Sequence, residues 1–182
     1  MGAGGDALRT SFGSLRRWRA SDAGSLARHA NNPAVARTMS DAFPSPYGPD
    51  DARRFLALAA TQAGFFAICT ADDEAVGGIG VAPGADIYRL TGEVGYWLAE
   101  PFWGRGIVAE ALTVFTPFAF KRFGLVRLYA RPFATNAASG RVLEKAGYAL
   151  EARLRANVVK NGAVLDQLVY AALAPGARPG PA

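Results

Sequence analysis

The sequence has few of the residues that build metal-held or disulfide-bonded scaffolds. Cys69 and His29 are the single cysteine and the single histidine among 182 residues. One cysteine excludes an intramolecular disulfide framework and a thiolate metal cluster, and one histidine excludes a zinc site built mainly on imidazoles. The longest nearly uncharged apolar stretch, 108–120, is well short of the roughly 20 residues that span a bilayer. We therefore expect no metal and no membrane segment.

The composition is that of one folded domain. Apolar residues make up 51% of the chain and charged residues 19%, which are ordinary values for a globular protein. A chain of this length forms one domain and buries a sizeable core. The two ends are rich in glycine, alanine and proline, so we expect flexible segments at 1–12 and 175–182 around a domain at 13–174.

The positive charge is dispersed. The formal net charge is +5, and the 20 basic residues are spread along the chain without forming runs. A nucleic-acid-binding module is thus the least favoured class, while phosphate-rich small ligands remain compatible with this charge. The first residues lack the apolar core of a signal peptide, so we expect a cytoplasmic protein.

Apolar periodicity and turn residues predict the order of the elements. We expect strands at 15–18, 65–70, 75–81, 87–98, 125–131, 148–159 and 164–173, and helices at 21–31, 49–62, 105–122 and 136–146. Ser21 is the expected N-cap of the first helix. This order predicts a single α/β (α+β) domain, with a mixed, mostly antiparallel sheet of about seven strands flanked by about four helices.

A glycine-containing turn between a strand and a helix is the first candidate site. Gly104 and Gly106 bracket Arg105 directly before the helix expected at 105–122. The first turn of a helix has backbone N–H groups without partners, and these attract anions. Glycines let a phosphate approach the backbone. A tight turn that needs positive φ explains the same residues, and the pattern is neither a Walker loop nor a complete dinucleotide motif.

The second candidate site lies on the helix expected at 136–146. Asn136 and Ser139 are three residues apart and share one helix face, which continues through Gly140 and Leu143. An N-cap role for Asn136 accounts for that residue equally well.

Together the two stretches resemble the Gcn5-related N-acetyltransferase (GNAT) superfamily, and within it the ribosomal-protein alanine N-acetyltransferases. The matching motifs are Glu-Val-Gly-Tyr-Trp-Leu at 93–98, Trp-Gly-Arg-Gly at 103–106, and the run from Asn136 to Tyr148. The resemblance covers roughly residues 14–172. It implies direct transfer of acetyl from acetyl-CoA, as co-substrate, to a primary amine, and it is compatible with a homodimer.

The resemblance also implies where acetyl-CoA is held. The pantetheine arm would pair with the end of the long strand, and Asn136 would contact the arm. The pyrophosphate would lie on the amides of the glycine turn, and Arg141 would face the nucleotide. The implied cofactor-binding residues are Trp97, Leu98, Ala99, Gly104, Arg105, Gly106, Ile107, Val108, Ala109, Asn136 and Arg141.

Two positions depart from the superfamily pattern. Val108 replaces a glycine or alanine of the phosphate loop, which would move the pyrophosphate slightly away from that amide. Leu143 stands where many members have a tyrosine as general acid, and leucine has no proton to give. Ser139 is therefore our candidate acid, with Tyr148 in reserve. Glu93 is our candidate base, acting through water.

The acceptor is not fixed by the sequence. A free α-amine has a pKa about two units below that of lysine, so it is the easier amine to deprotonate. This favours a protein N-terminus or a small-molecule amine. Trp18, Phe43 and Tyr47 are candidates for the acceptor wall. A non-catalytic acyl-CoA-binding sensor with the same fold is the alternative.

Overall fold

Eight strands form one sheet in the computed structural model, which describes residues 7–177. The strands are β1 (Leu8–Arg9), β2 (Gly13–Arg17), β3 (Phe65–Thr70), β4 (Ala75–Pro83), β5 (Thr91–Leu98), β6 (Arg127–Ala130), β7 (Ala149–Lys160) and β8 (Ala163–Leu173). Their order is β1-β2-β3-β4-β5-β6-β8-β7. Only the β5–β6 pair is parallel, so the prediction of a mostly antiparallel α/β fold is confirmed.

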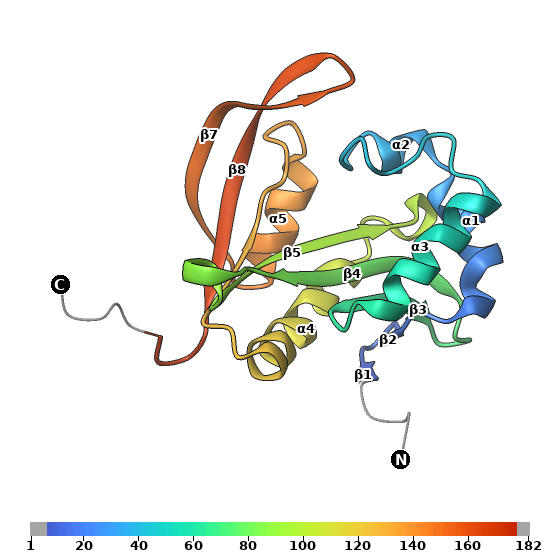
Figure 1. Ribbon diagram of the computed structural model, residues 1–182, viewed down its shortest axis with the longest axis horizontal. Coiled ribbons are helices and arrows are strands. Elements are labelled where there is room, and N and C mark those ends of the chain that lie inside the picture. Colours follow the sequence, from blue (N-terminus) through green and yellow to red (C-terminus); the bar gives the residue numbers. More distant parts are fainter. Residues whose placement is uncertain (1–6, 178–182) are drawn as a thin grey trace.

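Five helices cover the two faces of this sheet (Figure 1). They are α1 (Ala23–Ala30), α2 (Pro33–Ala36), α3 (Pro49–Thr61), α4 (Ile107–Phe123) and α5 (Ala137–Lys145), with short 3-10 turns at Ala20–Asp22, Asp86–Tyr88 and Glu100–Phe102. On one face, α4 and α5 bury Leu112, Phe115 and Leu143 against the sheet. On the other, α1 and α3 bury Leu26 and Leu56 in a second core.

The structure has one strand and one helix more than the sequence predicted. Strand β1 lies inside the segment expected to be flexible, where Leu8 pairs with Leu15; the expected domain start at residue 13 therefore falls inside a paired hairpin. Two residues are too short for an alternating pattern to be visible. Residues 1–6 and 178–182 of the expected flexible ends lie outside the described residues.

Helix α2 was not predicted, because its four residues carry too little periodicity. The Asn32 side chain accepts a hydrogen bond from the Ala34 N–H at 2.7 Å, and Pro33 occupies the first helical position. This pair ends one helix and starts the next.

The expected Ser21 N-cap is wrong, because Ser21 lies within the first 3-10 turn and Asp22 precedes α1. Asp22 is held by other groups: its carboxylate accepts from the Arg19 N–H at 2.8 Å and from Arg16 at 2.9 Å. The strand expected at 87–98 begins at Thr91, since the residues before it form a 3-10 turn.

Strand β5 is paired unequally with its two neighbours, and this creates the main opening in the sheet. It pairs with β4 from Gly92 to Leu98. With β6 it pairs only over its first three residues, opposite Arg127–Tyr129. Figure 1 shows the β7–β8 hairpin rising away from β4 and β5 beyond this point. One edge of the second half of β5 is therefore left without a strand partner.

A buried ion pair fastens the helical layer of α1 to the sheet. Arg16 of β2 and Asp22 are 6% and 5% exposed, and two guanidinium nitrogens each donate to a different carboxylate oxygen at 2.9 Å. Arg16 also donates to Asp73 in the turn between β3 and β4 at 2.5 Å. These carboxylates raise the pKa of Arg16 above its ordinary value.

We predict that Asp22→Ala lowers the free energy of unfolding by about 3 kcal/mol, because it leaves a buried cation without its main partner. Asp50→Ala removes only an exposed pair with Arg53 and should cost less than about 1 kcal/mol. Urea unfolding of both variants measures the difference. Equal losses would show that the buried pair has no special role.

Candidate functional site

The opening between β5 and β6 presents backbone groups of β5. The Ala99 N–H donates to the Val76 carbonyl at 2.9 Å, and the Gly84 N–H donates to the Thr91 carbonyl at 2.8 Å. Bonded pairs alternate along an antiparallel ladder, so the odd-numbered residues of β5 bond to β4. The N–H and C=O groups of Tyr96 and Leu98 consequently point into the opening.

Because of this alternation, the three residues at the end of β5 that were predicted to bind the cofactor do not all face the opening. The Ala99 N–H is bonded to β4, and the backbone groups of Trp97 also point toward β4. The Leu98 carbonyl accepts a hydrogen bond from the Trp103 indole N–H at 2.7 Å. The Leu98 N–H therefore remains as the donor of this segment that faces the opening.

The glycine turn directly follows this segment and has the geometry of an anion site. Gly104 and Gly106 have φ values of +75° and +77°, a region that favours glycine. The first bond of α4 runs from the Glu110 N–H to the Gly106 carbonyl. The preceding amides of Ile107, Val108 and Ala109 have no acceptor within the helix. The half-buried Val108 side chain packs against the larger core.

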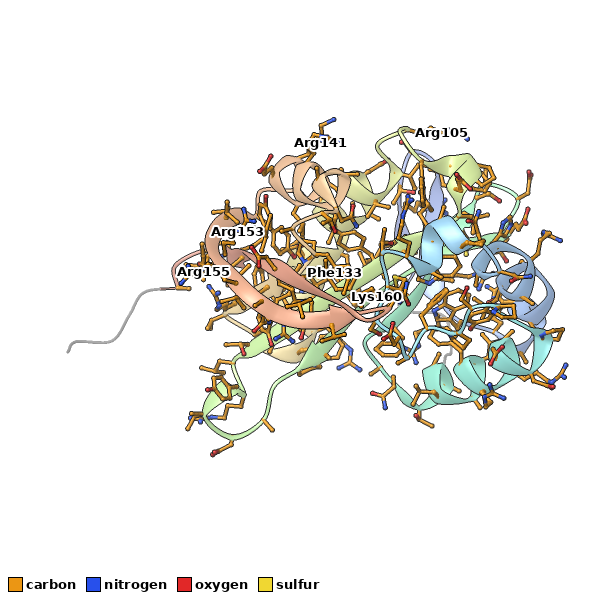
Figure 2. The ribbon with its side chains drawn as sticks, turned by 90° about the horizontal axis from the view of Figure 1, so that it is seen from above. Arg105, Phe133, Arg141, Arg153, Arg155 and Lys160 are labelled. Atoms are coloured by element: carbon orange, nitrogen blue, oxygen red, sulfur yellow. The ribbon has the colours of Figure 1, made fainter. Side chains whose placement is uncertain are left out.

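The two arginines proposed for the nucleotide lie at one edge of the molecule. Figure 2 shows Arg105 and Arg141 projecting from the same edge, and both are exposed. The Arg105 guanidinium lies 5.5 Å from the Phe12 ring centre and 5.8 Å from that of Phe102. These rings hold a positive charge beside the start of α4.

Asn136 forms the N-cap of α5. Its side-chain oxygen accepts from the Ser139 N–H at 3.2 Å, so this oxygen has the predicted capping role. The side-chain amide group of Asn136 can still donate to a ligand.

Ser139 is bonded to a residue that the sequence analysis did not connect with it. The Tyr96 hydroxyl lies 2.7 Å from the Ser139 Oγ. Burial raises the pKa of Tyr96 above its ordinary value, so the phenol keeps its proton. Tyr96 belongs to the strand motif, but its side-chain partner comes from α5 and is visible only in the folded chain.

Glu93 forms a bidentate ion pair. Its two carboxylate oxygens accept from Arg131 Nε at 3.0 Å and from a terminal Arg131 nitrogen at 2.7 Å. Both side chains remain partly exposed, at 35% and 40%. The carboxylate has lone pairs left for a water molecule or an amine. Arg131 follows β6 directly, and no local pattern linked it to Glu93.

The candidate base and acid approach the opening from opposite faces of β5. Side chains alternate along a strand, so Glu93 and Tyr96, three residues apart, point to different sides. Tyr96 packs against the core formed with α4 and α5, and it holds Ser139 on that side. Glu93 points to the face covered by the N-terminal helices.

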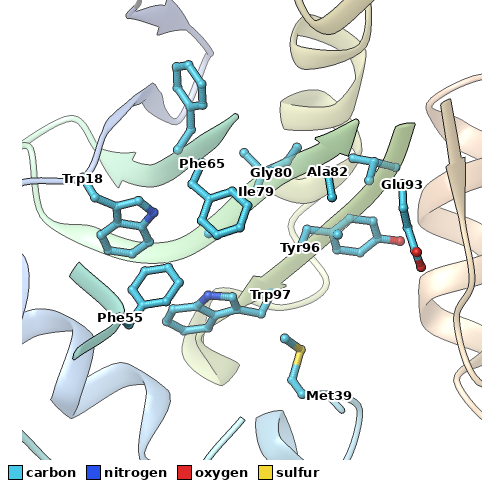
Figure 3. A pocket seen from close by; sticks show the side chains of 14 residues that line it. Trp18, Met39, Phe55, Phe65, Ile79, Gly80, Ala82, Glu93, Tyr96 and Trp97 are labelled. Atoms are coloured by element: carbon cyan, nitrogen blue, oxygen red, sulfur yellow. The ribbon is translucent and has the colours of Figure 1, made fainter. Parts of the chain in front are cut away.

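A cavity of about 340 Å³ lies on the Glu93 face of the sheet (Figure 3), and Trp18 lines it. Phe43 and Tyr47, the other two candidates for the acceptor wall, line a second cavity of about 360 Å³. Both cavities include Met39, Phe55 and Trp97. Trp97 was expected at the cofactor site, whereas Met39 and Phe55 were not singled out, because their grouping depends on how α3 packs on the sheet.

The reserve acid Tyr148 and the single histidine His29 are both bonded to other side chains. The Tyr148 hydroxyl is buried and bonds to the Thr116 hydroxyl at 2.8 Å, and burial raises the Tyr148 pKa to about 12. His29 is bonded to Glu74 at 2.7 Å. Among residues 7–177, no group of three or more His, Cys, Asp or Glu side chains is placed to hold a metal ion. No helix of the described chain is long and apolar enough to cross a membrane.

Comparison with known proteins agrees with this geometry. Residues 14–149 match the model of the acetyltransferase (GNAT) domain, so the chain belongs to the GNAT family. A Bacillus subtilis protein named "Probable N-acetyltransferase YjcK" is 38% identical over 60% of this chain and 61% of its own length. The chain thus spans about three fifths of the length of the first curated relatives that it matches.

Solved structures share the fold. Ribosomal-protein-S5-alanine acetyltransferase from Vibrio fischeri superposes with a TM-score of 0.80, at 22% identity, over 96% of this chain and 100% of its own. RimL, a ribosomal L7/L12 α-N-protein acetyltransferase solved with coenzyme A, has a TM-score of 0.81 at 20% identity, over 92% and 98%. The chain therefore resembles ribosomal-protein acetyltransferases in fold as well as in motif.

We predict that Cys69 does not react with Ellman's reagent at pH 8 in the native protein. The residue is fully buried, and burial raises the pKa of its thiol to about 12. At pH 8 only about one thiol in 10⁴ is then the reactive thiolate. Denatured protein should release one equivalent of chromophore per chain. Rapid reaction of the native protein would show that β3 opens readily.

Proposed function

We propose that this protein is an acetyl-CoA-dependent N-acetyltransferase that acts on a primary amine, either a protein N-terminal α-amine or a small-molecule amine. One observation carries the proposal: the Leu98 N–H, which faces the β5–β6 opening, is followed by the glycine turn and the amide-rich start of α4 at Ile107. A thioester arm and a diphosphate are two adjoining parts of one ligand that this arrangement fits.

The residues present suit acetyl-CoA along its length. The amides of Gly106, Ile107, Val108 and Ala109 would bind the pyrophosphate, as helix N-termini bind phosphates. Arg105 and Arg141 are exposed cations at the same edge and would meet the nucleotide phosphates. The remaining residues of the proposed cofactor site are Trp97, Leu98, Ala99, Gly104 and Asn136, with the Leu98 amide as the principal donor to the arm.

Acetyl-CoA would supply an activated thioester carbonyl. The Leu98 N–H would donate to the carbonyl oxygen as negative charge develops on it. Glu93 would accept a proton from the attacking amine through water, with Arg131 fixing the carboxylate. On the opposite face, the Ser139 hydroxyl would give its hydrogen bond to the departing sulfur. The C–N bond forms as the C–S bond breaks, and alignment of the two reactants is the main contribution of the protein.

Acceptor basicity supports an α-amine or another weakly basic amine. The amine must be neutral to attack, and deprotonating lysine at a given pH costs about 3 kcal/mol more than deprotonating an α-amine. Two solved structures with the same fold are named as acetyltransferases of ribosomal proteins. These names support a protein N-terminus as one acceptor class.

An acyl-CoA-binding sensor without turnover is the second candidate. Leu143 stands where many members of the superfamily have the acidic tyrosine, and it is fully buried. If the Tyr96–Ser139 pair does not replace that tyrosine, the fold would bind acetyl-CoA without transferring the acetyl group.

We predict that acetyl-CoA and CoA each raise the thermal midpoint, whereas ATP has little effect. Ligand at about 100 times its dissociation constant adds about 2.7 kcal/mol of stability. At about 2–4 °C per kcal/mol for a chain of this size, the midpoint should rise by roughly 5–11 °C. Thiol release with a panel of amines then separates enzyme from sensor. No shift with either CoA form at millimolar concentration would contradict the proposal, and a shift without release from any amine would favour the sensor.

We predict that Ser139→Ala lowers kcat about 10²-fold, at the low end of losses for a general acid, with KM for acetyl-CoA nearly unchanged. Tyr96→Phe removes the partner that orients this hydroxyl and should lower kcat about tenfold. The double variant should be no slower than Ser139→Ala, because both changes act on one proton donor. Steady-state thiol release measures all three.

Tyr170→Phe is the matched control, since it also removes a tyrosine hydroxyl bonded to a side chain, that of Glu144, and has no proposed role in the reaction. It should keep the kcat of the unmodified protein. Multiplicative losses in the double variant would show that Tyr96 acts independently of Ser139.

A further inference from the structure

The cavity beside Glu93 is walled by aromatic and apolar side chains from several parts of the chain. Trp18 follows β2, Phe55 comes from α3, and Phe65 begins β3, while Met39 and Trp97 complete the wall (Figure 3). The Trp18 and Phe55 rings meet edge to face at 5.3 Å, and the Phe55 and Phe65 rings are stacked at 6.3 Å. These rings hold one another in place, so the cavity is already formed.

Glycines keep the floor of this cavity low. A Cβ atom at Gly78 would lie 2.8 Å from the Trp97 indole nitrogen, and one at Gly80 would lie 2.9 Å from the Phe65 ring. The absence of side chains at these two glycines therefore lets the Trp97 and Phe65 rings pack directly against the β4 backbone. Gly95 of β5 differs, because a Cβ atom there would meet nothing within 4 Å. The space above Gly95 is consequently open to a ligand.

Charge is confined to one end of the cavity. Glu93 is the one ionisable residue with a formal charge at neutral pH among the lining residues. Figure 3 shows its carboxylate at the opposite end from Trp18 and Phe55. An amine near this carboxylate would lie beside the proposed base, and any group attached next to the amine would extend over Gly95 toward the rings.

We propose that this cavity selects primary amines that carry a bulky apolar or aromatic group on the neighbouring carbon. The inference rests on the proposed acetyltransferase function and adds the acceptor class. A volume of about 340 Å³ is at the small end of ligand pockets and holds one side chain of the size of phenylalanine or leucine. An acidic group would lose its hydration among apolar walls and face Glu93, so it is selected against.

The test compares acceptors that differ in one group. Tripeptide amides beginning with Phe, Leu, Ala or Asp, and phenethylamine, are assayed by thiol release with saturating acetyl-CoA. We expect kcat/KM for the Phe and Leu peptides to exceed that for the Ala peptide at least tenfold, since one methylene in an apolar pocket is already worth 10-fold or more. The Asp peptide should be slowest. Phenethylamine against the Phe peptide distinguishes a small amine from a peptide end.

A pocket-filling variant links the preference to this cavity. Gly95→Val places two methyl groups in the open space and should reduce the Phe-to-Ala ratio of kcat/KM to about 1. Gly24→Ala is the matched control, because Gly24 is exposed on α1 and a Cβ atom there also meets nothing within 4 Å. It should leave the ratio unchanged.

The outcomes separate this inference from the function on which it rests. Thiol release with a Phe-to-Ala ratio near or below 1 in the unmodified protein overturns the acceptor class and leaves the acetyltransferase function standing. An unchanged high ratio in Gly95→Val also overturns the assignment to this cavity. The absence of release from every amine, while acetyl-CoA still raises the thermal midpoint, contradicts the proposed function itself.

Discussion

The structure depends on the unequal pairing of one strand. Strand β5 is paired with β4 along seven residues but with β6 along three. The sheet therefore opens between these two strands beyond Glu93. Unpaired backbone groups are costly when buried, and an opening of this kind persists because a ligand or water satisfies them. The Leu98 amide, the glycine turn and the two candidate catalytic side chains all take their positions from this divergence.

Because side chains alternate along β5, the candidate acid and the candidate base approach from opposite faces of the sheet. Tyr96 is half-buried against the α4–α5 core and is bonded to Ser139. Glu93 lines the aromatic cavity at its far end and is held by Arg131. Glu93 would accept the proton of the amine through water on one face. The departing sulfur would receive the Ser139 hydrogen bond on the other. The same two-residue period also leaves Gly95 between Glu93 and Trp97, where a small residue makes room for the acceptor.

Local sequence signals predicted the elements that have strong local causes. The glycine turn was predicted because positive φ and amides without helical acceptors follow from residue type and position. The capping role of Asn136, one of the two alternatives that the sequence left open, is confirmed for the same reason. Strand β1 and helix α2 were missed because two and four residues carry too little periodicity. The Glu93–Arg131 and Tyr96–Ser139 contacts join residues 38 and 43 positions apart, so no spacing rule within one element could reveal them. The cavity likewise depends on packing between α3 and the sheet.

The backbone amides of β5 and α4 provide the most direct test of the proposed thioester site. In a nitrogen-15 NMR titration of the 19.1 kDa chain with acetyl-CoA, the Leu98, Val108 and Ala109 amides should shift and exchange more slowly with solvent. The Ala99 amide, already bonded to Val76, serves as the internal reference and should keep its exchange rate. Protection of the α4 amides without any change at Leu98 would contradict the claim that the opening beside β5 receives the thioester.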